Sequence, residues 1–248
     1  QREWVDVLNP ARLNERIGRV ETCDISDIDR AMQIATQAAA TWAYTPASVR
    51  AQALEACADD IERQTLTYMA MLMHEAGKTA RDALAEVREA IDFLRYYAAQ
   101  ARTTFDAKTH VPLGPVVCIS PWNFPLAIFT GQVAAALAAG NPVLAKPAEQ
   151  TPLIAGMAVQ ALIRHGVPPE VLHLLPGEGS QIGAALVAHP KACGVVFTGS
   201  TEVAKAIHRQ LAQRLGPNGQ AIPLIAETGG QNAMVVDSSA LTEQVVKD

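Results

Sequence analysis

Residues 114–151 read GPVVCISPWNFPLAIFTGQVAAALAAGNPVLAKPAEQT, and this pattern predicts a strand, a helix and a second strand. The short apolar runs VVCIS and PVLAK stand near its two ends, and apolar side chains recur at helical spacing between them. Gly140 and Asn141 are residue types that end helices. Strands joined by a helix lie parallel in one sheet, so we expect a βαβ unit here.

Polar side chains follow both strands of this unit. Asn123 comes after the first strand, whereas Lys146 and Glu149 come at the end of the second. Open α/β sheets bind their ligands in the crevice beyond the carboxyl ends of the strands. We therefore expect all three side chains to point into one crevice.

The alternation of helices and strands continues after residue 151 and indicates a larger parallel sheet. The predicted fold class is α/β with a doubly wound parallel sheet. A last strand is expected within 228–237, followed by a helix from about residue 240. The other expected elements are helices over 152–165, before His189 and over 200–215, and strands over 171–175, 194–199 and 222–227.

The first hundred residues are expected to form an extended strap and three helices. Residues 1–22 are typical of an edge hairpin or a surface strap. Thr45 and Pro46 open the second helix as its N-cap and first residue. The three predicted helices cover 26–42, 46–73 and 81–101.

Charged side chains of both signs mix along the helix expected over 81–101. Glu86 and Glu89 lie beside Arg88 and Arg95, a pattern typical of ion pairs on a solvated helix surface. We therefore expect Glu86 to be exposed and to have no role in a site.

The bulk composition describes a globular chain with no surface for nucleic acid or membrane. Of its 248 residues 49% are hydrophobic, and the mean hydropathy is +0.10, enough for a sizeable core. A net charge of −5 without a basic stripe argues against a nucleic-acid surface, and no apolar run approaches the ~20 residues of a membrane span. The chain begins Gln1-Arg2 without an initiator Met, so we expect a piece of a longer polypeptide. Its scattered cysteines indicate a cytoplasmic location.

The four cysteines are expected to be reduced thiols. Cys23, Cys57, Cys118 and Cys193 are scattered, without CxxC spacing or His partners at metal-ligand intervals. We expect Cys118 and Cys193 to pack in the core, none of the four to be a nucleophile, and no metal site.

Four polar positions could carry chemistry, and each has a plainer structural interpretation. Lys146 and Glu149 suit the vicinal hydroxyls of a ribose, or form a surface salt bridge. Asn123 offers an amide donor suited to an oxyanion, or stabilises a turn. Glu227 ends an apolar strand before two glycines and could activate water, or form a structural ion pair.

Two loops could bind phosphate. Residues 197–204, FTGSTEVA, follow a strand and open a helix, with Ser200 or Thr201 as N-cap, so its free amides could hold a pyrophosphate. An ordinary capped helix start is the alternative. The glycines of PGEGSQIG, residues 176–183, have one residue too many for a GxGxxG motif and are weak support for a dinucleotide.

Together PWNFP, LAKPAEQTP, LPGEGS, FTGSTEVA and ETGGQN resemble the aldehyde dehydrogenase superfamily, in its order and spacing. Longer stretches, among them EVREAIDFLRYYAAQAR and IPLIAETGGQNAMVVDSSALTEQVV, are similar to the aldehyde dehydrogenase domain of the bifunctional proline utilisation A family. That family joins an FAD-dependent proline dehydrogenase to an NAD-dependent L-glutamate γ-semialdehyde dehydrogenase. The resemblance implies a Rossmann-like NAD-binding domain, truncated before most of the catalytic domain.

The resemblance also implies domain boundaries and residue roles. Residues 1–110 would be the strap and helices of the NAD-binding domain, 111–230 its Rossmann-like core, and 231–248 the start of the catalytic domain. Asn123 would donate to the thiohemiacetal oxyanion and also border the cofactor, and Glu227 would be the base for thioester hydrolysis. The other implied cofactor-binding residues are Ile119, Ser120, Pro121, Trp122, Lys146, Ala148, Glu149, Gly179, Gly183, Phe197, Thr198, Gly199, Ser200, Val203, Thr228 and Gly229.

The implied activity is the oxidation of L-glutamate γ-semialdehyde to L-glutamate by cysteine attack, hydride transfer to NAD and hydrolysis of the acyl-enzyme. The family's nucleophilic cysteine lies some tens of residues beyond Glu227, so we expect the 248-residue chain to be inactive alone. Glu149 favours NAD over NADP, because a carboxylate repels a 2′-phosphate. The implied partners are a small aldehyde substrate, a proline dehydrogenase domain with FAD in the parent chain, and a second copy in a homo-oligomer.

Two alternatives stay open. An aldehyde dehydrogenase of other specificity is one, because overall resemblance alone names the substrate. A non-catalytic nucleotide-binding or interaction module is the other, although it would not need Asn123 and Glu227. Thr228 and Ala204 replace the Leu and Gly of many relatives, and we expect these changes to leave the cofactor site intact.

Overall fold

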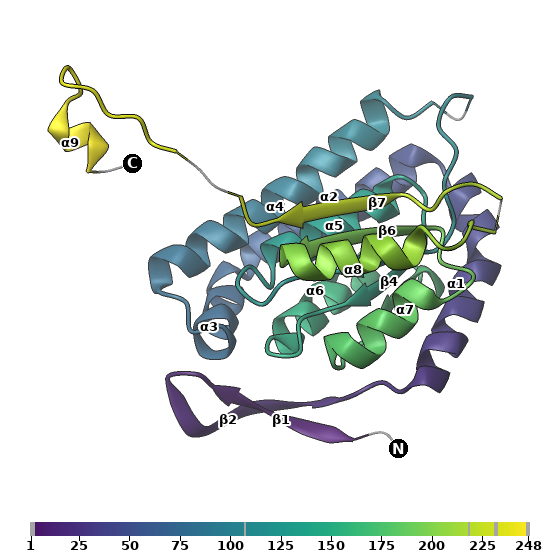
Figure 1. Cartoon of the computed structure of the whole chain (residues 1–248), viewed down its shortest axis with the longest axis horizontal. Coiled ribbons are helices and arrows are strands. Elements are labelled where there is room, and N and C mark those ends of the chain that lie inside the picture. The colour runs from purple at the N-terminus through teal and green to yellow at the C-terminus, as the bar shows by residue number, and fades with distance from the viewer. Residues whose placement is uncertain (1–2, 107, 218, 231–232, 247–248) are drawn as a thin grey trace.

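The computed structural model describes residues 3–106, 108–217, 219–230 and 233–246. At its centre is a five-stranded sheet in the order β5-β4-β3-β6-β7, in which every neighbouring pair is parallel (Figure 1). The predicted parallel sheet is thereby confirmed. Its strands are β3 (Val116–Ile119), β4 (Val143–Lys146), β5 (Leu172–Leu174), β6 (Gly194–Gly199) and β7 (Leu224–Thr228).

Helices cover both faces of the sheet, as a doubly wound fold requires. Successive side chains of a strand point to opposite faces, so Val116 of β3 joins the core beneath α5 and α6, whereas Val117 joins the core beneath α1, α7 and α8. The covering helices are α5 (Ala127–Ala138) and α6 (Pro152–Arg164) on one face, and α1 (Ile25–Tyr44), α7 (Ala184–Ala188) and α8 (Thr201–Leu211) on the other.

A second helical layer and a hairpin complete the described part of the chain (Figure 1). Helices α2, α3 and α4 pack outside α5 and α6 and share their apolar core. The predicted strap is an antiparallel hairpin of β1 and β2. These elements are β1 (Trp4–Asn9), β2 (Arg12–Glu21), α2 (Ala47–Arg63), α3 (Thr65–Glu75) and α4 (Ala80–Thr103); short helices are the 3₁₀ turn Pro169–Val171, the π-helix Gly179–Gly183 and α9 (Thr242–Val245).

The structure corrects the helix predicted over 46–73. It is two helices, because Gln64 leaves helical geometry at φ −101° and ψ 19° and the Thr65 hydroxyl donates to the Glu62 carbonyl at 2.7 Å. Such a local side-chain bond competes with the helix ladder. The N-cap of the first of the two is Pro46 and not Thr45.

The last predicted strand, within 228–237, is also wrong for the residues that the structure describes. Strand β7 ends at Thr228, and residues 233–237 carry no secondary structure. Val235 is 92% exposed there. A strand needs a neighbour to satisfy its backbone, and none of the described strands lies beside this segment. Residues 231–232 of this prediction lie outside the described residues.

Candidate active site

The predicted site residues meet at the carboxyl edge of the sheet, around its topological switch point. Strands β3 and β6 are neighbours, but the chain leaves them toward opposite edges of the sheet. Doubly wound sheets bind their ligands in a crevice at such a switch point, between the loops that follow the two strands. Ile119 at the end of β3 pairs with Lys146 on one side and with Phe197 on the other. Beyond Phe197, Thr198 pairs with Glu227 of β7. The sheet thus brings five of the predicted positions to one edge.

Lys146 is a buried cation at this edge. Its side chain is only 3% exposed, and its Nζ donates to the Pro147 carbonyl at 3.0 Å and lies 3.6 Å from Glu149 Oε2. Burial lowers the pKa of Lys146, while the Glu149 carboxylate opposes that shift. The salt bridge of the structural alternative is thus present, but Lys146 is buried and only the Glu149 side chain, half exposed, reaches the surface.

Glu149 connects the loop after β4 to the loop after β5. Its Oε2 accepts a hydrogen bond from the Gly179 amide at 2.9 Å. A Cβ at Gly179 would lie 3.9 Å from both Lys146 Nζ and Glu149 Oε2, and one at Gly183 would lie 3.6 Å from Lys146 Cδ. The two glycines therefore leave space beside a cation and a carboxylate. The residues present thus fit the ribose of a nucleotide, whose vicinal hydroxyls need an acceptor and a donor.

The loop after β6 has the geometry of an anion-binding helix start. The Ser200 hydroxyl caps α8 by accepting from the Val203 amide at 3.2 Å, so Ser200, and not Thr201, is the N-cap. A Cβ at Gly199 would stand 2.6 Å from Cζ of Phe197, so a larger residue would displace that ring. The positive end of the α8 dipole thus faces the crevice at the switch point.

Asn123 and Glu227 lie on exposed segments on the two sides of this crevice. The loop after β3 carries Asn123 between Trp122 and Phe124, which are 59% and 43% exposed. Glu227 is exposed on β7. The pKa of Tyr97 on α4 is raised mainly by burial, then by Tyr96, and then by the charge of Glu227. Glu227 therefore lies near α4.

The remaining predicted positions follow the same strand ends and differ in exposure. Ser120 and Ala148 are buried, whereas Val203, Thr228 and Gly229 are exposed, and Pro121 is half-buried. Their roles stay predictions, because position alone does not show what they bind.

Gln132 is a site residue that the sequence analysis missed. It lies on α5, is 7% exposed, and its amide nitrogen donates to Thr198 Oγ1 at 2.9 Å and to the Ile119 carbonyl at 3.2 Å. This amide bridges the ends of β3 and β6, where the crevice opens. The available signal was a polar residue within the Ala-rich helix predicted between the two strands.

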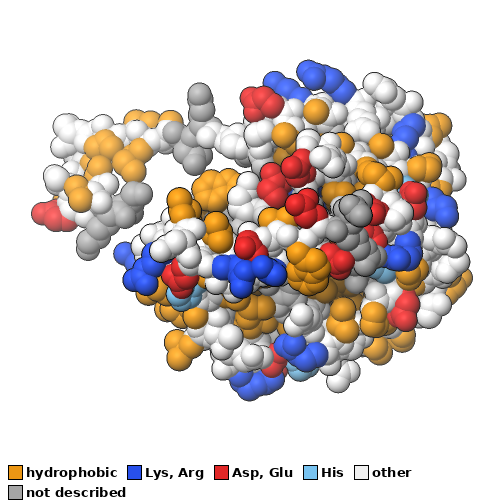
Figure 2. Space-filling view, turned by 90° about the horizontal axis from the view of Figure 1, so that it is seen from below, with side chains coloured by type: hydrophobic (Ala, Val, Ile, Leu, Met, Phe, Trp, Pro, Cys, Tyr) orange, Lys and Arg blue, Asp and Glu red, His pale blue; other side chains and the backbone are white. Residues whose placement is uncertain are grey.

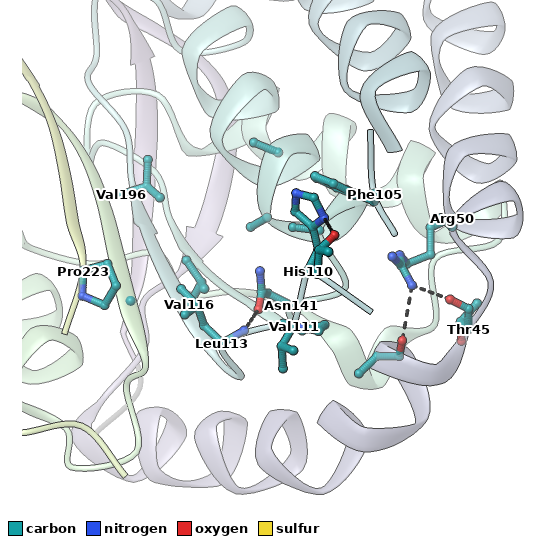
Figure 3. A pocket seen from close by; sticks show the side chains of 18 of the residues that line it. Thr45, Arg50, Phe105, His110, Val111, Leu113, Val116, Asn141, Val196 and Pro223 are labelled. Carbon is teal, nitrogen blue, oxygen red and sulfur yellow. Dashed lines mark hydrogen bonds between the residues drawn. The ribbon is translucent and has the colours of Figure 1, made fainter. Parts of the chain in front are cut away.

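A cavity lies at the opposite, amino edge of the sheet (Figure 3). Its volume is about 710 Å³, and its lining is mostly apolar. Asn141 Oδ1 accepts from the Leu113 amide at 2.7 Å on one wall, while buried Arg50 donates to the Ala138 carbonyl at 3.0 Å and to the Thr45 carbonyl. Burial lowers the pKa of Arg50. None of the predicted site residues lines this cavity.

Two cysteines are unsuited to nucleophilic chemistry in this environment. Burial raises the pKa of the Cys57 thiol to about 12 and that of Cys118 further, and the thiolate is the reactive form. Cys118 is buried as predicted, whereas Cys193 is only partly buried. The Cys23 amide donates to the Pro176 carbonyl, which follows β5. Strands β5 and β7 are the two outermost strands of the sheet, so Cys23 lies on the side away from β7.

The remaining surface and side-chain clusters offer neither a metal site nor a membrane span among the described residues. Over residues 3–106, 108–217, 219–230 and 233–246, no group of three His, Cys, Asp or Glu could hold a metal ion. Within the same ranges, no helix is long and apolar enough to cross a bilayer. Positive and negative side chains are interspersed over the face shown in Figure 2.

Comparison with known proteins places this geometry in a family. A profile of the aldehyde dehydrogenase family matches residues 1–248. The chain belongs to the aldehyde dehydrogenase family. The family resemblance inferred from PWNFP, FTGSTEVA and ETGGQN is thereby confirmed.

Three relatives of this aldehyde dehydrogenase chain are informative. It is 58% identical over 246 residues to the bifunctional protein PutA of Klebsiella aerogenes, covering 99% of the chain and 19% of PutA. A crystal structure of Bradyrhizobium japonicum proline utilization A is 51% identical with a TM-score of 0.86, covering 92% of the chain and 24% of that protein. A 1-pyrroline-5-carboxylate dehydrogenase from Thermus with bound NAD is 36% identical with the same TM-score, covering 92% and 47%. The chain therefore spans about a fifth of the PutA relative and about half of the dehydrogenase.

Proposed function

We propose that this chain is the NAD-binding part of an enzyme that oxidises L-glutamate γ-semialdehyde to L-glutamate in proline catabolism. The observation that carries the proposal is the buried Lys146 beside Glu149 and Gly179 at the carboxyl edge of the sheet. The names of the relatives support the substrate, and the NAD in the Thermus dehydrogenase supports the cofactor.

The crevice residues would hold the two ends of NAD, which would supply the hydride acceptor. The Lys146 ammonium would donate to a hydroxyl of the adenosine ribose, and the Glu149 carboxylate would accept from one. Ser200 and the start of α8 would bind the pyrophosphate, with Val203 packed at the adenine side. Thr228 and Gly229 would adjoin the nicotinamide. The remaining cofactor-path residues proposed are Ile119, Ser120, Pro121, Trp122, Ala148, Gly183, Phe197, Thr198 and Gly199.

Asn123 and Glu227 would act on the substrate. The Asn123 side-chain amide would donate to the oxygen of the aldehyde as negative charge develops there. The Glu227 carboxylate would take a proton from the water that hydrolyses the acyl intermediate. Both lie on exposed segments beside the crevice, where a substrate can reach them.

The wider assembly belongs to the same proposal. A proline dehydrogenase domain with its FAD would lie elsewhere in a bifunctional protein, as the family resemblance implies; the relative's name, bifunctional protein PutA, agrees with a second activity. Divisions of this chain near residues 110 and 230, a homo-oligomeric state and a cytoplasmic location remain predictions.

Calorimetric titration of the chain with NAD tests the cofactor site. Lys146→Ala and Glu149→Ala should each weaken binding about tenfold, because each removes a hydrogen bond to or from a charged group. Lys191→Ala and Glu170→Ala are matched controls, since both side chains are exposed at the amino edge of the sheet. Equal affinities in all four variants would place the cofactor elsewhere, and a folded chain that binds no NAD would contradict the proposal.

Turnover by the purified chain is expected to be absent. Cys57 and Cys118 are buried with raised pKa values, and Cys193 lies at the amino edge of the sheet, where its amide donates to the Pro115 carbonyl. NADH absorbance with L-glutamate γ-semialdehyde and NAD should not rise above the level without protein. Formation of NADH at a steady enzymatic rate would show that one of the four cysteines is the nucleophile after all.

A further inference from the structure

Two helices beneath the site begin without a cap of their own. Leu126, the N-cap of α5, has no polar side chain, and the hydroxyl of Thr151, the N-cap of α6, makes no capping hydrogen bond. The first amides of a helix need acceptors, and a buried helix start without them is unfavourable. Both starts matter, because α5 follows the loop of Asn123 and α6 follows the loop of Glu149.

Both missing caps are supplied by buried carboxylates from the α3–α4 hairpin. Glu86 of α4, 1% exposed, accepts from the Leu126 amide at 2.8 Å and from the Ala127 amide at 3.3 Å. Glu75, the last residue of α3 and 3% exposed, accepts from the Leu153 amide at 2.6 Å and the Ile154 amide at 2.8 Å. The expectation that Glu86 is solvated is therefore wrong.

Each carboxylate holds the loop that precedes the helix it caps. Lys78 lies between the two carboxylates in sequence; its Nζ is 2.6 Å from Glu86 Oε2 and 4.2 Å from the centre of the Phe124 ring, next to Asn123. On the side of Glu75, the capped residue Leu153 follows Glu149 by four positions in the sequence. A charge at a helix start also gains from the helix dipole.

One short turn joins the two helices that carry these carboxylates. Helix α3 ends at Glu75, Gly77 takes φ +67° against Pro10 of the hairpin, and Thr79 caps α4 by accepting from the Asp82 amide at 3.2 Å. Helix α3 packs on α6 and helix α4 packs on α5 (Figure 1). The segment 75–86 therefore lies against both loop-bearing helices at once.

We propose that Glu75 and Glu86 are positioning residues that fix the Glu149 loop and the Asn123 loop relative to each other, with segment 75–86 as a clamp. The proposal deepens the proposed function and rests on it for the meaning of the two loops. It assigns a role to two residues that touch neither cofactor nor substrate. Neither carboxylate has any other charged partner near the crevice among its described contacts, apart from Lys78 on Glu86.

Hydrogen exchange of individual amides tests the clamp directly. The exchange is measured at pH 8, above the pKa of about 7 to which burial raises Glu75, so that its carboxylate is charged. In Glu86→Gln the amides of Leu126 and Ala127 should exchange about tenfold faster, and in Glu75→Gln those of Leu153 and Ile154, because each change removes a charged acceptor. The strand amides of β3 and β4 should keep their protection. Glu89→Gln is the matched control, an exposed carboxyl on the same helix α4 as Glu86.

NAD affinity supplies a second readout that a purely structural role would not move. Glu75→Gln should weaken NAD binding several-fold through the Glu149 loop, whereas Glu89→Gln should leave it unchanged. If the unsubstituted chain binds no NAD, the proposed function fails, but the exchange pattern still tests the clamp. Unchanged exchange at both helix starts, or a uniform rise that includes β3 and β4, would overturn the clamp. Where a Gln variant does not fold, Glu75→Asp and Glu86→Asp, which keep the charge but withdraw the oxygens by one methylene, should show the same local pattern.

Discussion

The pH dependence of stability should report on Glu75. Burial raises the pKa of Glu75 to about 7 from the ordinary 4.5, and the hydrogen bonds from the Ile154 and Leu153 amides only partly oppose that shift. At about 1.4 kcal/mol per pH unit, this difference corresponds to about 3 kcal/mol in the free energy of unfolding.

The sign follows from which state releases the proton first. The unfolded chain ionises Glu75 near pH 4.5, whereas the folded chain retains the proton until about pH 7. The stability contributed by the neutral acid is therefore full below pH 4.5 and is lost as the pH rises to about 7. Glu75→Gln does not titrate, so the free energy of unfolding of the original chain minus that of the variant should fall by about 3 kcal/mol between pH 4.5 and pH 8.

Urea denaturation at half-unit pH steps measures this difference. Glu170→Gln, which removes an exposed carboxyl, provides the baseline. A difference between the chain and Glu75→Gln that stays constant over the whole range would refute the burial argument. If the difference falls as expected, the ionised Glu75 side chain lowers the free energy of unfolding above pH 7. Such a loss of stability is expected of a residue whose function is to position a loop.

Asp60→Asn should destabilise the chain by about 2 kcal/mol at pH 7, as measured by urea denaturation. Burial alone would raise the pKa of Asp60, but hydrogen bonds from Arg164, Gln64 and His165 outweigh burial and lower that pKa to about 2. That loss should shrink as the pH falls from about 4 toward 2, and a loss equal at pH 7 and pH 2 would contradict the assignment. Gly140→Ala should lower stability by about 2 kcal/mol or more, since φ is +86° and the new Cβ would stand 2.9 Å from Pro112 Cγ. Gly219→Ala has φ +74° and no atom within 4 Å, so thermal denaturation should show only the backbone cost of about 1 kcal/mol, and equal losses in both variants would argue against the clash.

The regular part of the fold was predictable from local pattern. The runs VVCIS and PVLAK became β3 and β4 because buried parallel strands are short and continuously apolar. The break between α2 and α3 at Gln64 was not predictable. The hydrophobic periodicity continues across Gln64, and a change of backbone angles at one residue does not alter that periodicity. The strand expected within 228–237 failed, among the described residues, for lack of a neighbouring strand.

The site was predictable where chemistry and position coincide. Lys146 was conspicuous because an ammonium group at the end of a buried apolar strand is unfavourable without a partner. The structure shows it buried beside Glu149. The exposure of Glu86 was predicted wrongly. A helical pattern shows which residues share one face of a helix, but not that the start of another helix packs against that face. Gln132 was missed for the same reason: its partners belong to strands about 13 and 66 residues away.

The strand order also dictates when the crevice can form during synthesis. Val116 of β3 pairs with Val143 only 27 residues later, but its other partner, Gly194, follows 78 residues later. Helix α1, made first, packs on β4, β5 and α7, which emerge more than a hundred residues behind it. Contacts so distant in sequence slow folding, because the entropy cost of closing a long loop comes before the stabilisation from strand pairing. A nascent chain therefore carries α1 with an uncovered apolar face until β4, β5 and α7 leave the ribosome, and β3 with one unpaired edge until β6 does. The ligand crevice is thus among the last features to appear.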